Sequence, residues 1–270
     1  LGLPAPHNRE ALVRCCEAVA AAGAVPAVTA VLDGELVAGL DDRQVDRILA
    51  SDSKTAERDL PIAVAQAWES GVTTVSAALA IAETAGIQVF ATGGIGGVHR
   101  EVTDTGDISA DLGAIARRRV VTVSAGAKSF LDLPRTLEAL ETLGAPVVGW
   151  QTDEFPAFTA RSSGIQLSHR FDDIDGLATV ARTQIEGFRR GLLVVTPVPD
   201  SAALDQDVHD KALEAALDHV AEAGLRGAAV TPYVLEHIAA ASGGRSIPAN
   251  LALLENNSAL AGRLSAALAR

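Results

Sequence analysis

The lysines are the residues of this chain whose type most directly suggests chemistry. Only three of its 22 basic side chains are lysines, namely Lys54, Lys128 and Lys211, and the others are arginines. An amine can lose its proton under mild conditions whereas a guanidinium cannot, so a chain that otherwise uses arginine is expected to keep lysine where a neutral amine is needed. Each lysine is therefore a candidate for a role in nucleophilic chemistry.

Lys128 has the sequence context that best fits such a role. It lies in Ser124-Ala-Gly-Ala-Lys-Ser129, directly after the apolar run Val120 to Ser124. Ligands of α/β proteins bind at the carboxyl ends of strands, and desolvation there would leave an uncharged amine able to attack a carbonyl carbon. The alternative is an ordinary turn lysine, and the residues alone favour neither. A surface salt bridge is favoured for Lys54, and a solvated helical position for Lys211.

A glycine-rich segment, Thr92 to Arg100, follows another apolar run. Its four glycines let the backbone approach a ligand closely. The segment lacks the Gly-Lys-Ser/Thr ending of a Walker A loop and the acidic partner of a Rossmann fingerprint, so a nucleotide-cofactor site is not favoured. A tight structural turn is the alternative, and His99 is either an ordinary loop residue or a polar contact to a substrate.

Acidic and amide side chains form the third candidate group. Asp104, Asp107, Ser109 and Asp111 lie within eight positions, a composition that suits a hard divalent cation retaining most of its waters. The alternative is helix capping, with Asp107 as the N-cap. Asn250, one of four asparagines, follows Pro248 at the start of an expected helix and is either its N-cap or a hydrogen-bonding partner of a ligand.

The elements that must position these residues indicate an α/β protein, because helical patterns alternate with short β-rich runs. Strands are expected at 26–32, 35–37, 87–91, 120–124, 147–150 and 191–196. Helices are expected at 9–22, 41–50, 60–70, 74–85, 109–116, 133–143, 174–189, 203–223, 232–241 and 250–268. Asp33-Gly34 favours a type I′ hairpin turn between the first two strands. Residues 1–270 are interpreted as one domain with a helical C-terminal part.

Composition and charge exclude several classes of protein. Hydrophobic residues make up 48% and charged residues 21% of the 270 residues, which predicts a folded chain. The formal net charge of −12 repels phosphate backbones and anionic lipid, so no nucleic acid or membrane partner is expected. Cys15 and Cys16 are adjacent and provide no disulfide framework, which favours a reducing, cytoplasmic setting. No uninterrupted apolar segment has the length of a transmembrane helix.

Several longer motifs occur in order along the whole chain. They are Gly2-Leu-Pro-Ala-Pro-His-Asn8, Gly23-Ala-Val-Pro-Ala27, Arg58-Asp-Leu-Pro61, Gly71-Val-Thr-Thr-Val75, Val89-Phe-Ala-Thr-Gly-Gly-Ile-Gly-Gly-Val-His-Arg100, Asp107-Ile-Ser-Ala-Asp-Leu112, Ala125-Gly-Ala-Lys-Ser129, Leu140-Glu-Thr142 and Phe155-Pro-Ala-Phe158. With these motifs the chain resembles the pseudouridine-5′-phosphate glycosidase family, also called the indigoidine synthase A-like family.

The resemblance implies cleavage, or the reverse formation, of the C–C glycosidic bond between ribose 5-phosphate and uracil. A leaving carbon has no lone pair to protonate, so the two-carboxylate route of O-glycosidases does not apply. The family implies instead an imine between Lys128 and C1′ of the ring-opened sugar, which forms as the C–C bond breaks. Water then releases ribose 5-phosphate.

The resemblance also implies the remaining site residues and the architecture. Asp107 is expected to hold one manganese ion, largely through waters. Substrate contacts are expected from Lys54, Val75, Thr92, His99, Ser109, Asp111 and Asn250. The implied fold is a three-layer α/β/α sandwich with a mainly parallel or mixed central sheet, and the implied assembly is a homotrimer that binds a small sugar phosphate or nucleotide.

The chain departs from the family pattern at three places. The general acid of the family is a glutamate in a segment just before the first motif, and this sequence begins at Leu1 without a methionine, so that glutamate is expected upstream of residue 1. Glu57 and Glu101 stand where the family commonly has arginine and glycine. Val195-Thr-Pro-Val-Pro199 replaces the usual Asn-Pro-Ile-Pro, which could alter the base that is accepted.

Three other functions compete with C-glycoside cleavage. The first is a C-glycosynthase that joins ribose 5-phosphate to an aromatic natural product, which the arginine-rich, lysine-poor composition weakly favours. The second is a sugar-phosphate binding protein without catalysis. The third, a nicotinamide-dependent oxidoreductase, is disfavoured because the glycine loop has no acidic partner.

Overall fold

The centre of the molecule is a parallel β-sheet of five strands. The computed structural model describes residues 3–223 and 230–270, so Leu1 and Gly2 at the start of the first family motif lie outside it. The strand order is β5-β6-β9-β7-β8, and every pairing is parallel. The strands are β5 (Val89–Ala91), β6 (Val121–Ser124), β7 (Val147–Trp150), β8 (Arg170–Phe171) and β9 (Leu192–Val195).

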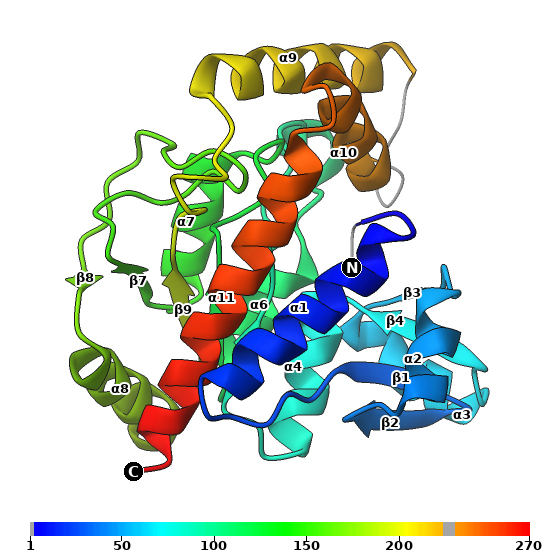
Figure 1. The fold of residues 1–270 in the computed structure, drawn as a ribbon, viewed down its shortest axis with the longest axis vertical. Coiled ribbons are helices and arrows are strands. Elements are labelled where there is room, and N and C mark those ends of the chain that lie inside the picture. The colour runs from blue at the N-terminus through cyan, green and yellow to red at the C-terminus, as the bar shows by residue number, and fades with distance from the viewer. Residues whose placement is uncertain (1–2, 224–229) are drawn as a thin grey trace.

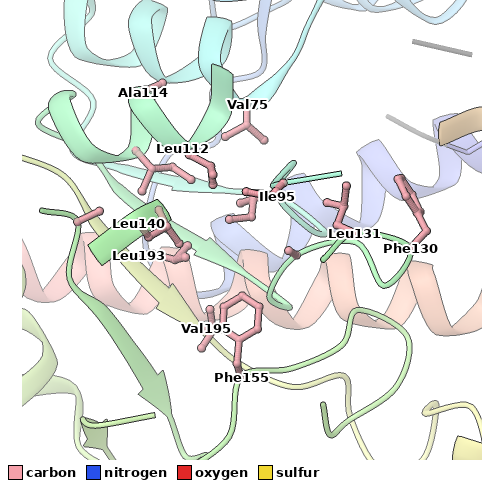
Figure 2. Close-up of a cluster of buried hydrophobic side chains, with 14 of the residues drawn as sticks. Val75, Ile95, Leu112, Ala114, Phe130, Leu131, Leu140, Phe155, Leu193 and Val195 are labelled. Atoms are coloured by element: carbon pink, nitrogen blue, oxygen red, sulfur yellow. The ribbon is translucent and has the colours of Figure 1, made fainter. Parts of the chain in front are cut away.

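Helices cover both faces of this sheet because its strands are apolar on both sides. On β9, Leu193 and Val195 face a cluster with α4 (Val75–Thr84), α6 (Ala110–Arg117) and α7 (Leu133–Thr142), and Figure 2 shows Leu193 with Leu112 and Leu140 in this cluster. The alternate residues Leu192 and Val194 face α8 (Ile174–Arg182) and α11 (Ser246–Leu268). The expected α/β/α sandwich is confirmed.

A second, smaller sheet of mixed direction lies beside the main sheet (Figure 1). Its order is β2-β1-β4-β3, and its elements are β1 (Thr29–Leu32), β2 (Glu35–Ala38), α2 (Asp42–Leu49), β3 (Lys54–Thr55), the 3-10 turn η1 (Glu57–Asp59), α3 (Leu60–Ala65) and β4 (Ser70–Thr73). The expected hairpin turn is present, with φ angles of 52° at Asp33 and 78° at Gly34. The sequence pattern did not indicate β3 or β4.

Two helices end earlier in the structure than the sequence pattern predicts. The helix expected over 60–70 ends at Ala65, and the chain turns at Ala67 (φ 49°) into β4, which bonds to β1 and β3. The helix expected over 174–189 is α-helical to Arg182 and continues as a π-helical turn, η2 (Thr183–Gly187). Pairing with distant strands decided the first boundary, and no local residue marks it.

The remaining helices pack mainly with one another, at both ends of the sequence. α1 (His7–Ala21) packs along α11, which crosses the molecule diagonally in Figure 1, and α9 (Gln206–Glu222) packs against α10 (Val230–Ala241). The short helix α5 (Val102–Thr105) was not expected. Because α11 begins at Ser246, Asn250 lies within it, and the interpretation of Asn250 as an N-cap is wrong. No helix in the described parts of the chain is both long and apolar enough to span a membrane.

Candidate active site

The loop after β6 carries Lys128 and is tied to the glycine-rich loop after β5. The backbone N–H of Lys128 donates to the carbonyl of Ile95 at 3.2 Å, and Ile95 and Ala127 form a parallel bridge. Gly126 has a φ of +74°, and a Cβ at this position would clash with the carbonyl oxygen of Pro156. A glycine is therefore needed to turn the chain from the strand into Lys128.

Asp111 joins this region to α4 and α6. Its carboxylate is 7% exposed and accepts backbone N–H groups from Ser76 at 3.0 Å and from Gly96 at 2.9 Å. Ser109 is the N-cap of α6 and accepts the N–H of Asp111 at 3.2 Å. Val75 is buried at the first turn of α4, next to Ser76. The residues expected from the Ser-Ala-Asp motif thus meet the glycine loop.

Burial shifts Lys128 toward its uncharged amine. Burial lowers the pKa of the Lys128 ammonium below the ordinary lysine value, and the positive charge of Lys54 lowers it further, while the Asp111 carboxylate opposes both effects. An uncharged amine is the nucleophilic form of lysine. A lowered pKa fits the interpretation of Lys128 as a nucleophile, which stays a prediction.

His99 and Asp107 lie together at the far end of the glycine loop. The N–H of His99 donates to the carbonyl of Asp107 at 3.1 Å, and the His99 Nε2 atom lies 3.8 Å from an Asp107 carboxylate oxygen. Asp107 is 37% exposed and does not cap α6, because Ser109 does. Asp104 is exposed. Residues 3–223 and 230–270 contain no group of three or more His, Cys, Asp or Glu side chains able to hold a metal ion.

The three other expected contact residues come from separate elements. Thr92 follows β5, and its N–H donates to Val123 at 3.0 Å. Asn250 is buried in α11, and Lys54 is exposed on β3. Lys54 forms no ion pair with any residue that the structure describes, so the salt bridge favoured for it is absent, and its charge acts on Lys128 instead. Lys211 is exposed on α9, as expected.

Sequence reasoning missed two residues that hold the glycine loop from outside. Asn257 of α11 donates from Nδ2 to the carbonyls of Thr92 at 2.7 Å and Gly93 at 3.2 Å. Thr136 of α7 accepts the N–H of Val98 through Oγ1 at 3.0 Å. The spacing of seven residues between Asn250 and Asn257 would have indicated a shared helix face.

The departures from the family pattern lie at different places. Glu57 is 14% exposed and pairs with Arg117 at 2.5 Å and with Arg118, both near the end of α6, so its side chain belongs to an ion-pair cluster. Glu101 is exposed before α5. The segment 195–199 follows β9 at the carboxyl ends of the strands, where Lys128 also lies. The backbone N–H of Thr196 donates to the carbonyl of Ser124 at 2.9 Å.

Comparison with known proteins identifies the family that shares this fold. The family model described as "Indigoidine synthase A like protein" matches residues 1–267, and the chain belongs to this family. Curated relatives named "Pseudouridine-5′-phosphate glycosidase" include one from Gemmatimonas aurantiaca, 50% identical over 99% of this chain and 87% of the relative. Another, from Myxococcus xanthus, is 47% identical over 100% of this chain and 90% of the relative.

Two solved structures share the fold. The prealnumycin C-glycosynthase AlnA, in complex with ribulose 5-phosphate, superposes with a TM-score of 0.89 and is 40% identical, covering 96% of this chain and 86% of that chain. An indigoidine synthase A-like protein from Thermotoga maritima superposes with a TM-score of 0.90 and is 35% identical, covering 100% and 89% of the two chains.

Proposed function

We propose that this protein is a C-glycosidase that cleaves pseudouridine 5′-phosphate into uracil and ribose 5-phosphate through an imine on Lys128. The observation that carries the proposal is the lysine itself, which has a lowered pKa and lies on the loop after β6, bonded through its backbone N–H to the glycine-rich loop after β5. The activity named for the curated relatives supports the same reaction.

The reaction follows from an uncharged amine at this position. The Lys128 nitrogen attacks C1′, and the ring oxygen leaves C1′ and takes up a proton. The nitrogen lone pair then forms the C=N bond while the bond from C1′ to the uracil carbon breaks, and that carbon takes up a proton. Water adds to the resulting imine and releases ribose 5-phosphate and the free amine, so that one water is consumed per substrate.

The surrounding side chains are proposed to bind the substrate. Lys54 supplies a positive charge for an anionic sugar phosphate in a chain whose net charge is −12. The polar contacts come from Thr92, His99, Ser109, Asp111 and Asn250, and Val75 lines the apolar side. We also propose that the protein works in the cytoplasm as a homotrimer, for which a light-scattering mass of three chains is the test.

A manganese ion is proposed at Asp107. The Asp107 side chain is 37% exposed and lies 3.8 Å from the His99 Nε2 atom, so a hydrated ion can reach its carboxylate from solvent. Manganese and magnesium commonly use one or two carboxylates and keep several waters, which fits a site with a single acidic ligand. When bound, the ion would supply positive charge for the anionic substrate.

Removal of this carboxylate tests the metal proposal. Asp107→Asn is expected to weaken Mn²⁺ binding at least tenfold, because the neutral amide removes the anionic ligand. Electron paramagnetic resonance of free Mn²⁺ measures the binding. Asp104→Asn removes a charge from an exposed neighbour and is expected to leave binding within twofold of the unmodified protein. Equal binding by the Asp107 variant would contradict the assignment.

Borohydride trapping tests the central proposal. Purified protein is incubated with ribose 5-phosphate, Mn²⁺ and borohydride, and the reduced pentose-phosphate adduct is mapped by peptide mass. The adduct is expected on Lys128, retained in Lys211→Arg and absent in Lys128→Arg, which keeps the charge but forms no imine. Binding of ribose 5-phosphate by calorimetry without any adduct would overturn the mechanism and indicate a catalytically silent sugar-phosphate binding protein.

A C-glycosynthase is the second candidate function. It is favoured by the 40% identity to the prealnumycin C-glycosynthase and by the changed segment Val195-Thr-Pro-Val-Pro199 at the sheet edge. Uracil release from pseudouridine 5′-phosphate supports the glycosidase. Inertness toward that substrate, together with coupling of ribose 5-phosphate to a polycyclic aromatic acceptor, supports the synthase.

A further inference from the structure

A buried asparagine on α11 holds the start of the glycine-rich loop. Asn257 is fully buried, and its Nδ2 donates to the carbonyl of Thr92 at 2.7 Å and to that of Gly93 at 3.2 Å. These bonds join a helix on one face of the sheet to the loop at its carboxyl edge. They connect positions separated by more than half the length of the chain.

The loop needs a donor from outside because the regular ladder between β5 and β6 skips one carbonyl there. The last register pair of these strands is Ala91 with Val123, and the N–H of Thr92 donates to the carbonyl of Val123. The N–H of Ala125 then donates to the carbonyl of Gly93 at 2.8 Å, whereas Asn257 provides the one described donor to the carbonyl of Thr92. Asn257 therefore helps to fix the path of the chain as it leaves the strand.

The loop residues that follow this bond contact the proposed site. Ile95 accepts the N–H of Lys128, and Gly96 donates to Asp111. Thr92 itself is one of the proposed substrate contacts. A change in the path of the chain at Thr92 and Gly93 therefore moves a substrate contact and the backbone anchor of the nucleophile together.

Packing alone does not explain an amide at this position. The Oδ1 atom of Asn257 is buried without a hydrogen-bond partner in the described residues, and a buried unpaired oxygen lowers stability. The neighbouring apolar positions of α11 include Leu253, Leu254 and Leu260, so leucine would fit the surroundings chemically. The neighbour Asn256 is partly buried and makes longer bonds, 3.4 Å to Thr196 and 3.5 Å to Pro197.

We propose that Asn257 is a positioning residue for the imine-forming site, which it serves by fixing the backbone of Thr92 and Gly93 against α11. This inference deepens the proposed function and rests on it. Asn257 acts through the loop and touches neither the substrate nor the reacting atoms.

The test compares Asn257→Leu with a control that loses stability elsewhere on α11. Leu264→Val removes a methylene from the buried cluster that α11 shares with α8, and Leu264 makes no hydrogen bond to the glycine loop through its side chain. The readouts are the unfolding temperature, the ribose 5-phosphate concentration that gives half-maximal borohydride adduct on Lys128, and the maximal trapping rate. A merely structural role would reduce the amount of folded protein and hence the maximum, and would leave the half-saturating concentration unchanged.

Asn257→Leu is expected to raise the half-saturating concentration at least fivefold, whereas Leu264→Val lowers the unfolding temperature and leaves that concentration within twofold. An adduct on Lys128 with unchanged half-saturation in Asn257→Leu would overturn the positioning role alone. Absence of the adduct in the unmodified protein would overturn the proposed function itself. Should the leucine variant not fold, Asn257→Asp keeps the shape, replaces the donor with an acceptor, and is expected to give the same increase.

Discussion

Lys128 shows how one side chain acquires its chemistry from burial and from two neighbours that are distant along the chain. Burial and the charge of Lys54 lower the pKa of its ammonium, and the Asp111 carboxylate raises it. Asp111 is itself held by two backbone N–H groups, so its charge is fixed in place. The net effect is a lowered pKa, and the negative charge of Asp111 stays close to the amine.

The rate of imine formation is expected to rise with pH and level off, with a midpoint below the ordinary lysine pKa. Lys54→Met removes a positive charge that lowers the pKa of Lys128, so the midpoint should move to higher pH. The measurement is the initial trapping rate with ribose 5-phosphate across pH. The matched variant Lys211→Met removes an exposed lysine on α9 and should leave the midpoint unchanged. A shift to lower pH in Lys54→Met would contradict the assigned electrostatics.

At the scale of elements, an ion-pair cluster connects η1, α4 and the end of α6. Glu57 pairs with Arg117 and Arg118, and Glu83 pairs with Arg118 at 2.7 Å and with Arg119 at 3.5 Å. The backbone N–H of Glu57 donates to the Ser76 hydroxyl, and the N–H of Ser76 donates to Asp111. The departure of Glu57 from the family pattern is therefore accommodated by the arginines of α6.

Glu57→Gln is expected to lower the free energy of unfolding by about 1–3 kcal/mol, because it leaves partly buried arginines short of a negative partner. Denaturant unfolding at low salt provides the measurement, and the loss should shrink as salt is added, because salt screens the interaction.

The exposed pair of Arg9 with Asp46 provides the control for this prediction. Arg9→Gln breaks a pair in which both side chains are more than half exposed, and the expected cost is about 0–1 kcal/mol. Equal losses in the two variants would show that the cluster contributes no more than an ordinary surface pair.

At the scale of the whole molecule, the site forms where segments from most of the chain converge. Lys54 comes from the small sheet, and the loops after β5 and β6 come from the main sheet. The segment 155–158 closes against them, with the N–H of Phe158 donating to the carbonyl of Ala125 at 3.0 Å. At Gly126 the converging segments leave no room for a side chain.

Gly126→Ala is expected to lower the free energy of unfolding by about 3 kcal/mol or more, and to reduce adduct formation on Lys128. A methyl group would meet both the strain of a φ of +74° and the Pro156 carbonyl. Gly86 has the same φ of +74° with nothing within 4 Å, so Gly86→Ala isolates the strain and should cost about 1–2 kcal/mol. Similar losses for both, measured by denaturant unfolding, would exclude the clash as a cause.

Local patterns determined much of this protein from the sequence alone. The periodicity of apolar residues predicts α4, α6, α7 and the strands β6, β7 and β9, because each buries a face that its own residues define. The Asp33-Gly34 turn follows from the conformations that these residues tolerate. The scarcity of lysine also made Lys128 a candidate, and the long motifs indicated the family.

Only the tertiary structure decided which distant groups meet. It ended α3 at Ala65 so that β4 could join β1, turned Glu57 toward Arg118, and brought Asn257 to Thr92. It also left Lys54 without an ion pair to any described residue and placed its charge near Lys128. Strand order and helix packing determine these contacts, and they depend on burial summed over the whole chain. The local sequence around a residue does not determine that total burial, so it cannot predict these contacts.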